Sequence, residues 1–405
     1  MPLPLEKMRV LDLSRALSGP FCSMILADLG ADVIKVEPAV SGDMSRTWGP
    51  FDRGESAYYL SGNHNKRGIA LNFRSPEGLR LLREMALKSD VILENFKPGT
   101  MAALGLDPQE LRALKPDLII ASISGFGSSG PLSARPGFDQ IAQGYSGFMS
   151  FTGTTEPTRV GIAIGDLTSG MWLAIGVLSA WIARQDSGRG DHVETSLLAS
   201  LVSLLSVQGQ RYLSIGEVAE PTGNVHPVIT PYGVFRAADG DMNIGAATQD
   251  MWLKLCEIIG RPDLKSDPRF LDNAHRMGHR QELREIIEAE LARGTRAYWS
   301  ELLVAAEIPA GPINTVEDAL NDPQVAHLGL VETVPHPTLG LLSQLSSPLK
   351  LAGAEDGWLR RAPPMLGQHT REVLEQYGYS PLEIQELEAR GVIAQGADDP
   401  KENAA

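Results

Sequence analysis

The sequence is poor in cysteine. Only Cys22 and Cys256 occur among 405 residues, and each lies in an apolar pattern typical of a helix. Buried free thiols are therefore favoured over a disulfide or a metal site. The histidines have no cysteine or third ligand nearby, so we expect no bound metal. The N-terminal residues lack the apolar core of a signal peptide, which predicts a cytoplasmic protein.

The sequence also lacks a membrane-spanning run and an excess of positive charge. The uncharged stretch 167–183 falls short of the roughly 20 residues that cross a bilayer. It contains Thr168 and Ser169, so it predicts a buried helix instead. The chain carries 50 acidic residues against 36 lysines and arginines, a formal net charge of -14. That balance disfavours nucleic acid and anionic membranes as partners.

Buried strands alternate with helices through the first third of the chain. The strand patterns are Arg9–Ser14, Asp32–Glu37, Asp90–Glu94 and Asp117–Ser124. This alternation predicts an α/β fold with an open parallel sheet. No Gly-x-Gly-x-x-Gly follows the first strand, so no nicotinamide site is predicted. Ligands bind beyond the carboxyl ends of such strands, here in loops 15–20, 95–99 and 124–130.

The composition predicts a two-part organisation. Residues 1–215 form the first part of a large α/β domain, with helices at 167–183 and 195–207. Residues 228–330 form a smaller α+β domain that begins with a hairpin, 233–237 and 241–245, turned by Ala238-Asp239-Gly240. From about residue 341 the chain is predicted to form a strand, a linker and then helices, and 394–405 are predicted to be a disordered tail.

Asp166 is the candidate for chemistry. It follows Gly165 and immediately precedes the uncharged helical stretch. A helix N-cap is the commoner role for aspartate at such a place. The alternative is a nucleophile or base held in a dry pocket, which the apolar surroundings would favour.

Two further segments suit a phosphorylated ligand. Cations occur in Asn63-His-Asn-Lys-Arg67 and at Arg74, where a solvated surface run is the alternative. Glu94-Asn-Phe-Lys-Pro-Gly99 offers an aromatic face and a cation just past a strand, where an ordinary turn is the alternative.

Taken in order, the motifs resemble those of the class III coenzyme A transferases, the family of formyl-CoA:oxalate, carnitine and succinyl-CoA:glutarate CoA-transferases. The resemblance covers nearly the whole chain. The matching stretches are Leu11-Asp-Leu-Ser14, Leu29-Gly-Ala-Asp-Val-Ile-Lys-Val-Glu37, Asn65-Lys-Arg67, Glu94-Asn-Phe-x-Pro-Gly99, Ser124-Gly-Phe-Gly-x-x-Gly-Pro131, Gly165-Asp-Leu-x-x-Gly170, Tyr232-Gly-Val-Phe235 and Leu366-Gly-Gln-His-Thr370.

The resemblance implies an enzyme without a prosthetic group that uses a CoA thioester as substrate. Asp166 would attack the donor acyl-CoA to give a mixed anhydride and then an aspartyl-CoA thioester, which an acceptor acid attacks. It also implies an interlocked homodimer whose large domain is built from both chain ends, so that residues 340–393 return to the large domain.

The family's CoA contacts map onto four segments. They are Leu17 and Ser18; Leu71, Asn72, Phe73 and Arg74; Asn95, Phe96 and Lys97; and Arg135, Pro136, Gly137 and Phe138. Two basic residues of the family are replaced here by Pro38 and Ala103. The phosphate contacts must then come from other cations, and Arg46, Lys66, Arg67 and Arg74 are available.

The same superfamily contains α-methylacyl-CoA racemases, whose proton-transfer histidine stands in a Gly-His-Asp triplet. Here the triplet is Gly137-Phe138-Asp139, and phenylalanine cannot ionise, which favours transferase over racemase. A catalytically silent acyl-CoA binding protein is a further alternative. The segments around Arg46 and Tyr58 look like the succinyl-CoA:glutarate branch, so a dicarboxylic acceptor is expected, with Arg46 and Tyr58 in its site. Arg15 is a second candidate cation.

Overall fold

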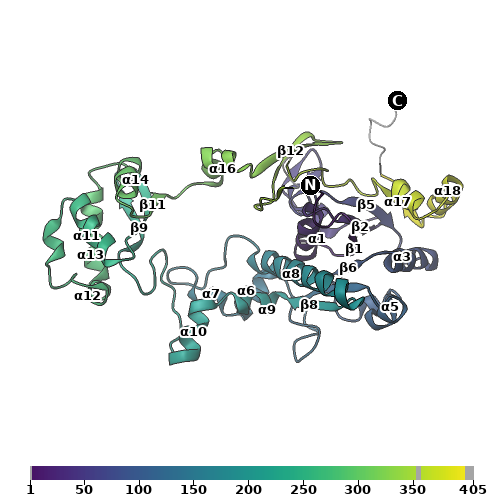
Figure 1. The fold of residues 1–405 in the computed structure, drawn as a ribbon, viewed down its shortest axis with the longest axis horizontal. Coiled ribbons are helices and arrows are strands. Elements are labelled where there is room, and N and C mark those ends of the chain that lie inside the picture. Colours follow the sequence, from purple (N-terminus) through teal and green to yellow (C-terminus); the bar gives the residue numbers. More distant parts are fainter. Residues whose placement is uncertain (1, 353–356, 397–405) are drawn as a thin grey trace. The chain divides into compact units, whose positions relative to one another are not determined.

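The computed structural model describes residues 2–352 and 357–396, which form two compact units (Figure 1). The large unit contains Met1–Phe148, Val160–Gln210 and the chain from Pro323 onward. The small unit contains Met149–Arg159 and Arg211–Asp322. The chain therefore leaves the large unit in mid-sequence and returns to it. The sequence prediction places 149–159 in the large domain, but Gly223 N donates to Gly153 O at 2.8 Å and ties that segment to the small unit.

A seven-stranded sheet forms the centre of the large unit. In spatial order its strands are β14 (Ile393–Ala394), β5 (Arg67–Leu71), β2 (Asp32–Pro38), β1 (Arg9–Asp12), β6 (Val91–Glu94), β7 (Ile119–Ser124) and β8 (His192–Ser196). All neighbouring pairs are parallel except β14 with β5. The sheet is therefore mixed, and the prediction of a purely parallel sheet is wrong at this edge.

The antiparallel edge also corrects the predicted tail. Ile393 lies opposite Leu71, and Ala394 O accepts a hydrogen bond from the Thr370 hydroxyl at 2.9 Å. Gly396 N donates to Gly367 O at 3.1 Å. Residues 394–396 are thus ordered against the sheet, because their backbone groups find partners there. Residues 397–405 of the predicted tail lie outside the described residues.

Two strands of the sheet differ from the sequence prediction. The predicted helix 195–207 begins instead as β8, and α9 (Leu197–Ser203) starts only where the Ser196 side chain accepts from Ala199 N. β-Branched Val193 and Thr195 suit a strand. β5 is absent from the prediction because its first residue, Arg67, makes the segment look like a charged loop.

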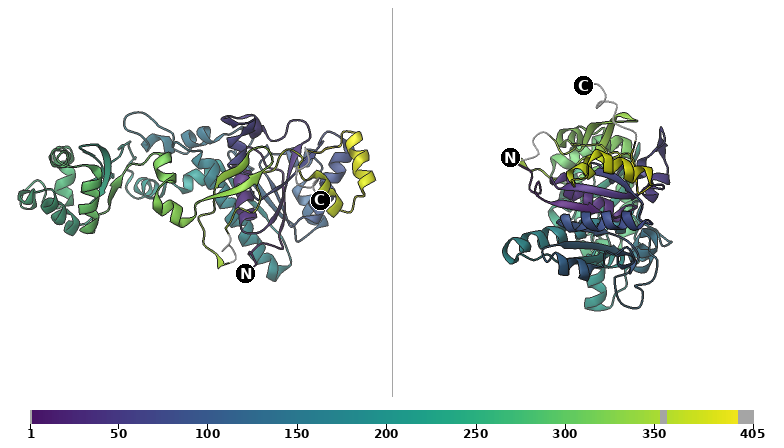
Figure 2. Two further views of the ribbon diagram at one scale, coloured as in Figure 1. Left: turned by 90° about the horizontal axis from the view of Figure 1, so that it is seen from above. Right: turned by 90° about the vertical axis from the view of Figure 1, so that its right-hand side faces the viewer.

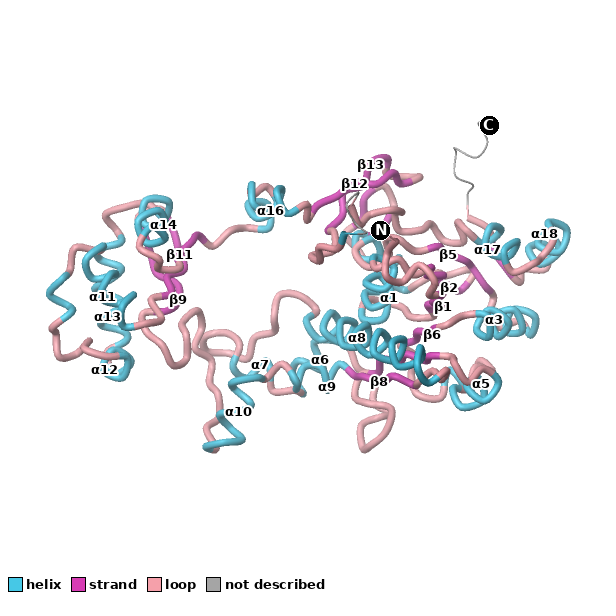
Figure 3. Tube along the Cα trace, in the orientation of Figure 1, coloured by secondary structure: helices cyan, strands magenta, loops and turns pink. Residues whose placement is uncertain are grey.

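Helices cover both faces of the sheet (Figures 2 and 3). One face packs on α1 (Ser18–Asp28) and α8 (Ile164–Ser187), with Cys22, Leu26 and Leu173 buried there. The other face packs on α3 (Pro76–Lys88), α17 (Thr370–Gln376) and α18 (Pro381–Ala389). Both cysteines are free and buried, as predicted.

Helix α8 is longer and less buried than predicted. It has 24 residues, and by length and composition it could cross a membrane, a test that core helices of soluble proteins also pass. Only 39% of its apolar window is buried. Its outer face exposes Trp172, Ile175 and Ile182. The large unit thus presents an apolar helix face to its surroundings.

The small unit has its own core. Its sheet consists of β9 (Tyr232–Ala237), β10 (Gly240–Gly245) and β11 (Ala310–Pro312). β9 and β10 form the predicted antiparallel hairpin. The helices α11 (Gln249–Ile258), α13 (Arg280–Leu291) and α14 (Arg296–Ala305) cover it. Trp252, Phe270 and Ile287 are fully buried between them.

Candidate active site

Asp166 lies in the first turn of α8 and is not its N-cap. The N-cap residue is Ala163, which has no side chain that could accept from the helix. The acceptor is supplied by α6 (Asp139–Tyr145), because Gly165 N donates to Asp139 Oδ1 at 2.7 Å. A Cβ on Gly165 would lie 2.9 Å from that oxygen, so any side chain there would force the Asp139 carboxylate to shift. The Asp166 carboxylate is thereby left available for chemistry.

Close packing of α1 on α8 brings Ser18 to Asp166. The helices meet at Gly170, where an added Cβ would lie 2.7 Å from Ser18 O. The Ser18 hydroxyl donates a hydrogen bond to the Asp166 carboxylate. The Gly-Asp-Leu-x-x-Gly motif thus has a structural reason for its second glycine, since any side chain at 170 would push the helices apart.

The pKa of the Asp166 carboxyl is raised to about 7. Burial is the largest cause, because it disfavours the charged form, and the nearby Asp139 carboxylate adds to it. The Ser18 hydrogen bond acts in the opposite direction. Asp166 therefore titrates near neutral pH and is only partly ionised there. Shifts of this kind are typical of catalytic carboxyls.

Asn95 fixes the loop that precedes Ser18. Its Oδ1 accepts from Arg15 N at 2.9 Å and its Nδ2 donates to Arg15 O at 2.8 Å. The same Nδ2 lies 3.4 Å from Ser18 Oγ. Arg15 in turn lies over the Phe96 ring, 5.7 Å from its centroid. The predicted residues at 17–18 and 95–96 are thus joined to Asp166 through one hydrogen-bonded loop.

The buried ion pair between Asp43 and Lys35 stabilises the same loop. Asp43 Oδ1 accepts from Ala16 N at 3.0 Å, and Ala16 has a positive φ of 66°. Asp43 also pairs with Lys35 at 2.9 Å, and Lys35 donates to Ser14 O at 2.9 Å. Neither Asp43 nor Asp139 was identified from the sequence. Asp139 stands directly after the predicted Phe138, but no local signal shows that it caps α8, and none marks Asp43.

The segment 135–138 lies beside the carboxylate that caps α8. Gly137 packs on Gly125, where a Cβ on either would lie 2.9 Å from the other backbone. Arg135 donates to the Tyr145 hydroxyl at 2.7 Å. Phe138 immediately precedes Asp139 and is 61% exposed as a residue. The ring is thus near the site but does not cover it in the large unit.

The segment 71–74 lies at the same sheet edge but farther away. Leu71, the last residue of β5, is fully buried, so its side chain does not reach solvent. Asn72 Nδ2 donates to Gly391 O at 3.1 Å, Phe73 packs partly buried, and Arg74 is exposed. Two strands separate β5 from β6, which places these segments on the order of 14 Å apart at normal strand spacing. An elongated ligand could contact both.

Three of the four predicted phosphate cations are already paired. Lys66 is fully buried and lies 3.2 Å from Asp12. Arg67 lies 2.8 Å from Asp32 and also pairs with Glu372. Arg46 lies 2.7 Å from Glu37. Lys66 and Arg67 are therefore not available for phosphate, because Lys66 neutralises the buried Asp12 and Arg67 is held between Asp32 and Glu372.

The predicted acceptor residues are not gathered at Asp166. Arg46 stacks on Tyr59, with 3.7 Å between its guanidinium carbon and the ring centroid. Tyr58 contacts Trp48 edge to face at 5.1 Å. Arg46 makes its ion pair with Glu37, on β2, and not with Asp166. Arg15 is closer to the site through its bonds to Asn95.

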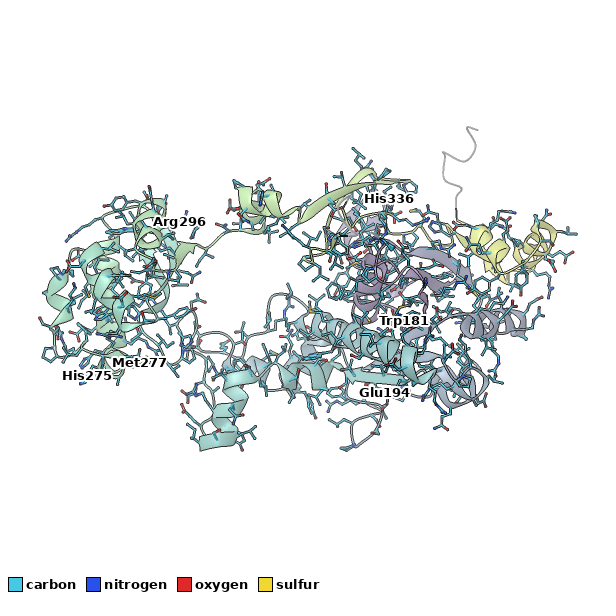
Figure 4. The ribbon with its side chains drawn as sticks, viewed as in Figure 1. Trp181, Glu194, His275, Met277, Arg296 and His336 are labelled. Atoms are coloured by element: carbon cyan, nitrogen blue, oxygen red, sulfur yellow. The ribbon has the colours of Figure 1, made fainter. Side chains whose placement is uncertain are left out.

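A cavity of about 230 Å³ opens beyond the ends of β6, β7 and β8. Phe96 and Lys97 line it, together with Glu94, Ser122 and Glu194; Glu194 is labelled on β8 in Figure 4. Burial raises the pKa of Glu94, and Phe96 N donates to its carboxylate at 2.7 Å. No group of three metal-binding side chains occurs in the part of the chain that the structure describes.

The fold and the site together describe an α/β protein with a buried carboxyl, Asp166, whose pKa is raised to about 7. The sequence matches the profile of CoA-transferase family III over residues 5–370. Succinyl-CoA:glutarate CoA-transferase of Mus musculus is 39% identical over 97% of this chain and 91% of its own. Succinate–glutarate CoA-transferase of Agrobacterium fabrum is 37% identical over 92% of this chain and 95% of its own.

Solved structures agree with this assignment. A CAIB/BAIF family protein from Brucella suis superposes with a TM-score of 0.84 at 35% identity, covering 93% of this chain and all of its own. The chain belongs to CoA-transferase family III. It is therefore an enzyme that transfers coenzyme A, and its substrates are CoA thioesters.

Proposed function

We propose that this enzyme transfers CoA from succinyl-CoA to a small dicarboxylic acid, with Asp166 as the nucleophile. The observation that carries the proposal is the environment of Asp166, a partly desolvated carboxylate held by Ser18 beside the loop that Asn95 fixes. The choice of substrates is supported by the relatives, a succinyl-CoA:glutarate and a succinate–glutarate CoA-transferase.

The reaction would run through covalent intermediates on Asp166. The carboxylate attacks the thioester carbonyl, the carbon–sulfur bond breaks, and CoA thiolate leaves as the mixed anhydride forms. The thiolate then attacks the aspartyl carbonyl, which releases succinate and leaves an aspartyl-CoA thioester. The acceptor carboxylate displaces CoA thiolate from this thioester, giving a second anhydride. Attack of the thiolate on the acceptor carbonyl forms the new acyl-CoA and regenerates Asp166.

Water must be kept from the anhydride for transfer to exceed hydrolysis. We propose that the Phe138 ring, beside the site and exposed in the free chain, closes over the acyl group when substrate binds. Phe138 cannot ionise, so the racemase alternative lacks its proton-transfer partner.

We also propose a cytoplasmic homodimer. Support comes from the exposed apolar side chains of α8, which in an isolated chain would remain in water. Sedimentation at the mass of a single chain would contradict the dimer.

The proposal is tested with a panel of acids. Succinyl-CoA is mixed with glutarate, oxalate, itaconate, mesaconate, citramalate and malate, and the new CoA thioesters are identified by mass spectrometry. We expect exchange with at least one dicarboxylic acid and little hydrolysis. In deuterated water, a 2-methylacyl-CoA should take up no label at its α-carbon. Rapid label uptake without CoA exchange would favour the racemase.

A first prediction concerns the CoA contacts. Phe96→Ala and Arg74→Ala are each expected to weaken CoA binding by about 1–3 kcal/mol, because one loses packing and the other a charged contact. Arg189→Ala, an exposed arginine outside the predicted segments, is the matched control. Calorimetric affinities equal to that of the control in both variants would place the CoA site elsewhere.

A second prediction concerns pH. Only ionised Asp166 can attack, so kcat/KM for succinyl-CoA should rise about tenfold per pH unit up to about 7 and then level off. Asp139→Asn removes the like charge but keeps an oxygen that can accept from Gly165 N. It should therefore shift the rise to lower pH. A profile that is flat through neutrality in both proteins would contradict the assignment.

A further inference from the structure

The chain reverses direction in a tight turn between β1 and α1. A Cβ added to Gly19 would lie 2.2 Å from the Cβ of Ser14, so the two ends of the turn are in contact. Between them Ala16 adopts the left-handed conformation, with a φ of 66°. Residues other than glycine adopt this conformation rarely, because the Cβ then crowds the backbone. It persists only where the surrounding contacts hold the residue in place.

Asp43 supplies such a contact. Its Oδ1 accepts from Ala16 N at 3.0 Å, and also from Ser45 N and the Ser45 hydroxyl, each at 2.9 Å. The other carboxylate oxygen, Oδ2, lies 2.9 Å from Lys35 Nζ. Asp43 and Lys35 are both buried, so water competes poorly for these bonds.

The Asp43 carboxylate is a charged acceptor at every pH at which Asp166 titrates. Burial by itself would raise the pKa of Asp43, but the Lys35 ammonium and the hydrogen bonds from Ser45 N and Ala16 N hold that pKa below its ordinary value. A hydrogen bond to a charged acceptor is stronger than one between neutral groups. The contact between Asp43 and Ala16 therefore does not weaken as Asp166 ionises.

The position of Ser18 depends on this turn. Helix α1 begins at Ser18, and its N-cap residue, Leu17, has no side chain that accepts from the helix. The first residue of α1 is therefore placed by the turn before it and by the packing of α1 on α8. From this position the Ser18 hydroxyl donates to the Asp166 carboxylate. A change in the turn would weaken that hydrogen bond.

We infer that Asp43 is a positioning residue for the transfer reaction, because it holds Ala16 in the left-handed turn and thereby holds the Ser18 hydroxyl on Asp166. The inference rests on the proposed role of Asp166 as nucleophile. Burial and the Asp139 carboxylate raise the pKa of Asp166, and the Ser18 hydrogen bond lowers it. Loss of the contact between Asp43 and Ala16 should therefore raise this pKa further, as loss of the Ser18 hydroxyl would.

The first test compares two double variants that leave no unpaired charge at positions 35 and 43. Lys35→Met with Asp43→Asn keeps an oxygen that can accept from Ala16 N, whereas Lys35→Met with Asp43→Leu does not. Replacing a buried ion pair by apolar side chains of similar volume is often neutral for stability. The pKa of Asp166 is measured from the pH dependence of unfolding, as the difference between each variant and the same variant carrying Asp166→Asn.

The variant with Asp43→Leu should raise the pKa of Asp166 by roughly one pH unit, the effect of losing one hydrogen bond to a charged group. The variant with Asp43→Asn should raise it by less than half as much. Ser18→Ala should match the variant with Asp43→Leu, and combining the two should give no further rise. Equal values of the Asp166 pKa in the two double variants would overturn the inference.

A second pair of variants leaves Asp43 unchanged and decides the question if the variant with Asp43→Leu does not fold. Ala16→Val opposes the left-handed conformation, because β-branched residues rarely adopt a positive φ, whereas Ala16→Gly adopts it freely. Ala16→Val should raise the pKa of Asp166 as Ser18→Ala does, and Ala16→Gly should raise it much less. Equal effects of valine and glycine at this position would also overturn the inference.

These measurements separate the inference from the proposed function. The pKa of Asp166 is read from unfolding and needs no turnover, so absence of CoA transfer by the unchanged protein would contradict the proposed function alone. In an active transferase, the pH at which kcat/KM levels off should move upward together with the Asp166 pKa. A pH profile that stays in place while that pKa rises would overturn the role of Asp43 in the reaction.

Discussion

Asp166→Asn is expected to lower the rate of CoA transfer by on the order of 10³-fold or more, because the amide cannot form the anhydride. The variant keeps the size of the side chain and an oxygen that can accept from Ser18. Gly165 N remains bonded to Asp139, so the start of α8 should be unchanged. CoA affinity should therefore stay within about twofold, since no charged contact to CoA is lost.

Hydroxylamine trapping separates the possible outcomes. The unchanged protein mixed with succinyl-CoA should give an aspartyl hydroxamate at residue 166, whereas the variant should give none. Ser18→Ala is a useful companion, because it removes the hydrogen bond but leaves the nucleophile, and so should retain part of the rate. Substantial transfer by Asp166→Asn would exclude Asp166 as the nucleophile. Absence of any adduct in the unchanged protein would favour a silent acyl-CoA binding protein.

The same variant should also change stability in a pH-dependent way. Folding raises the pKa of the Asp166 carboxyl from 3.8 to about 7, so the folded state favours the protonated form. The fold is therefore most stable below pH 3.8, and it loses this stability as the pH rises from 3.8 to about 7. Removing the carboxyl should therefore stabilise the fold by roughly 2–3 kcal/mol more at about pH 8 than at about pH 5. Urea unfolding at the two pH values measures the difference.

The sequence identified the parts of the site that are local. Asp166 stands in a short motif, and Asn95 and Ser18 follow recognisable strands, so motif and topology together place them at one edge of the sheet. Contacts between distant segments were not predictable in the same way. Asp139 lies 26 residues before the Gly165 amide that it holds. Asp43 reaches Ala16 from a loop that no pattern distinguishes from a surface turn.

In the fold, too, features with a local sequence signal were predictable, and features that depend on distant segments were not. Strands with continuous apolar runs, such as 32–37 and 90–94, are recognisable because a short apolar run between turn residues is typical of a buried strand. β5 and β8 were missed because Arg67 and His192 stand at their starts and resemble loop residues. Charge alone does not reveal whether a lysine is solvated or neutralised by a buried carboxylate. The roles of Lys66 and Arg67 therefore depend on partners that lie far away in the sequence.

Lys66→Met is expected to lower the free energy of unfolding by about 3–5 kcal/mol, the usual loss when one partner of a buried ion pair is removed. Lys66 is fully buried and donates to Asn63 Oδ1 at 2.8 Å and to Pro20 O at 2.9 Å. Its ammonium also lies 3.2 Å from Asp12. Burial by itself would raise the pKa of Asp12, but Lys66 and Lys35 outweigh it and hold that pKa at about 2.

The control is Arg74→Met, which removes an exposed cation from the same stretch of sequence and should cost less than about 0.5 kcal/mol. The KM for the CoA thioester should show the reverse order of effects. Arg74→Met should raise this KM, whereas Lys66→Met that has folded should leave it nearly unchanged. Adding Asp12→Asn to Lys66→Met should recover part of the lost stability, because the unpaired buried carboxylate is then removed as well. Unchanged unfolding of Lys66→Met together with a raised KM would show that Lys66 contacts CoA after all.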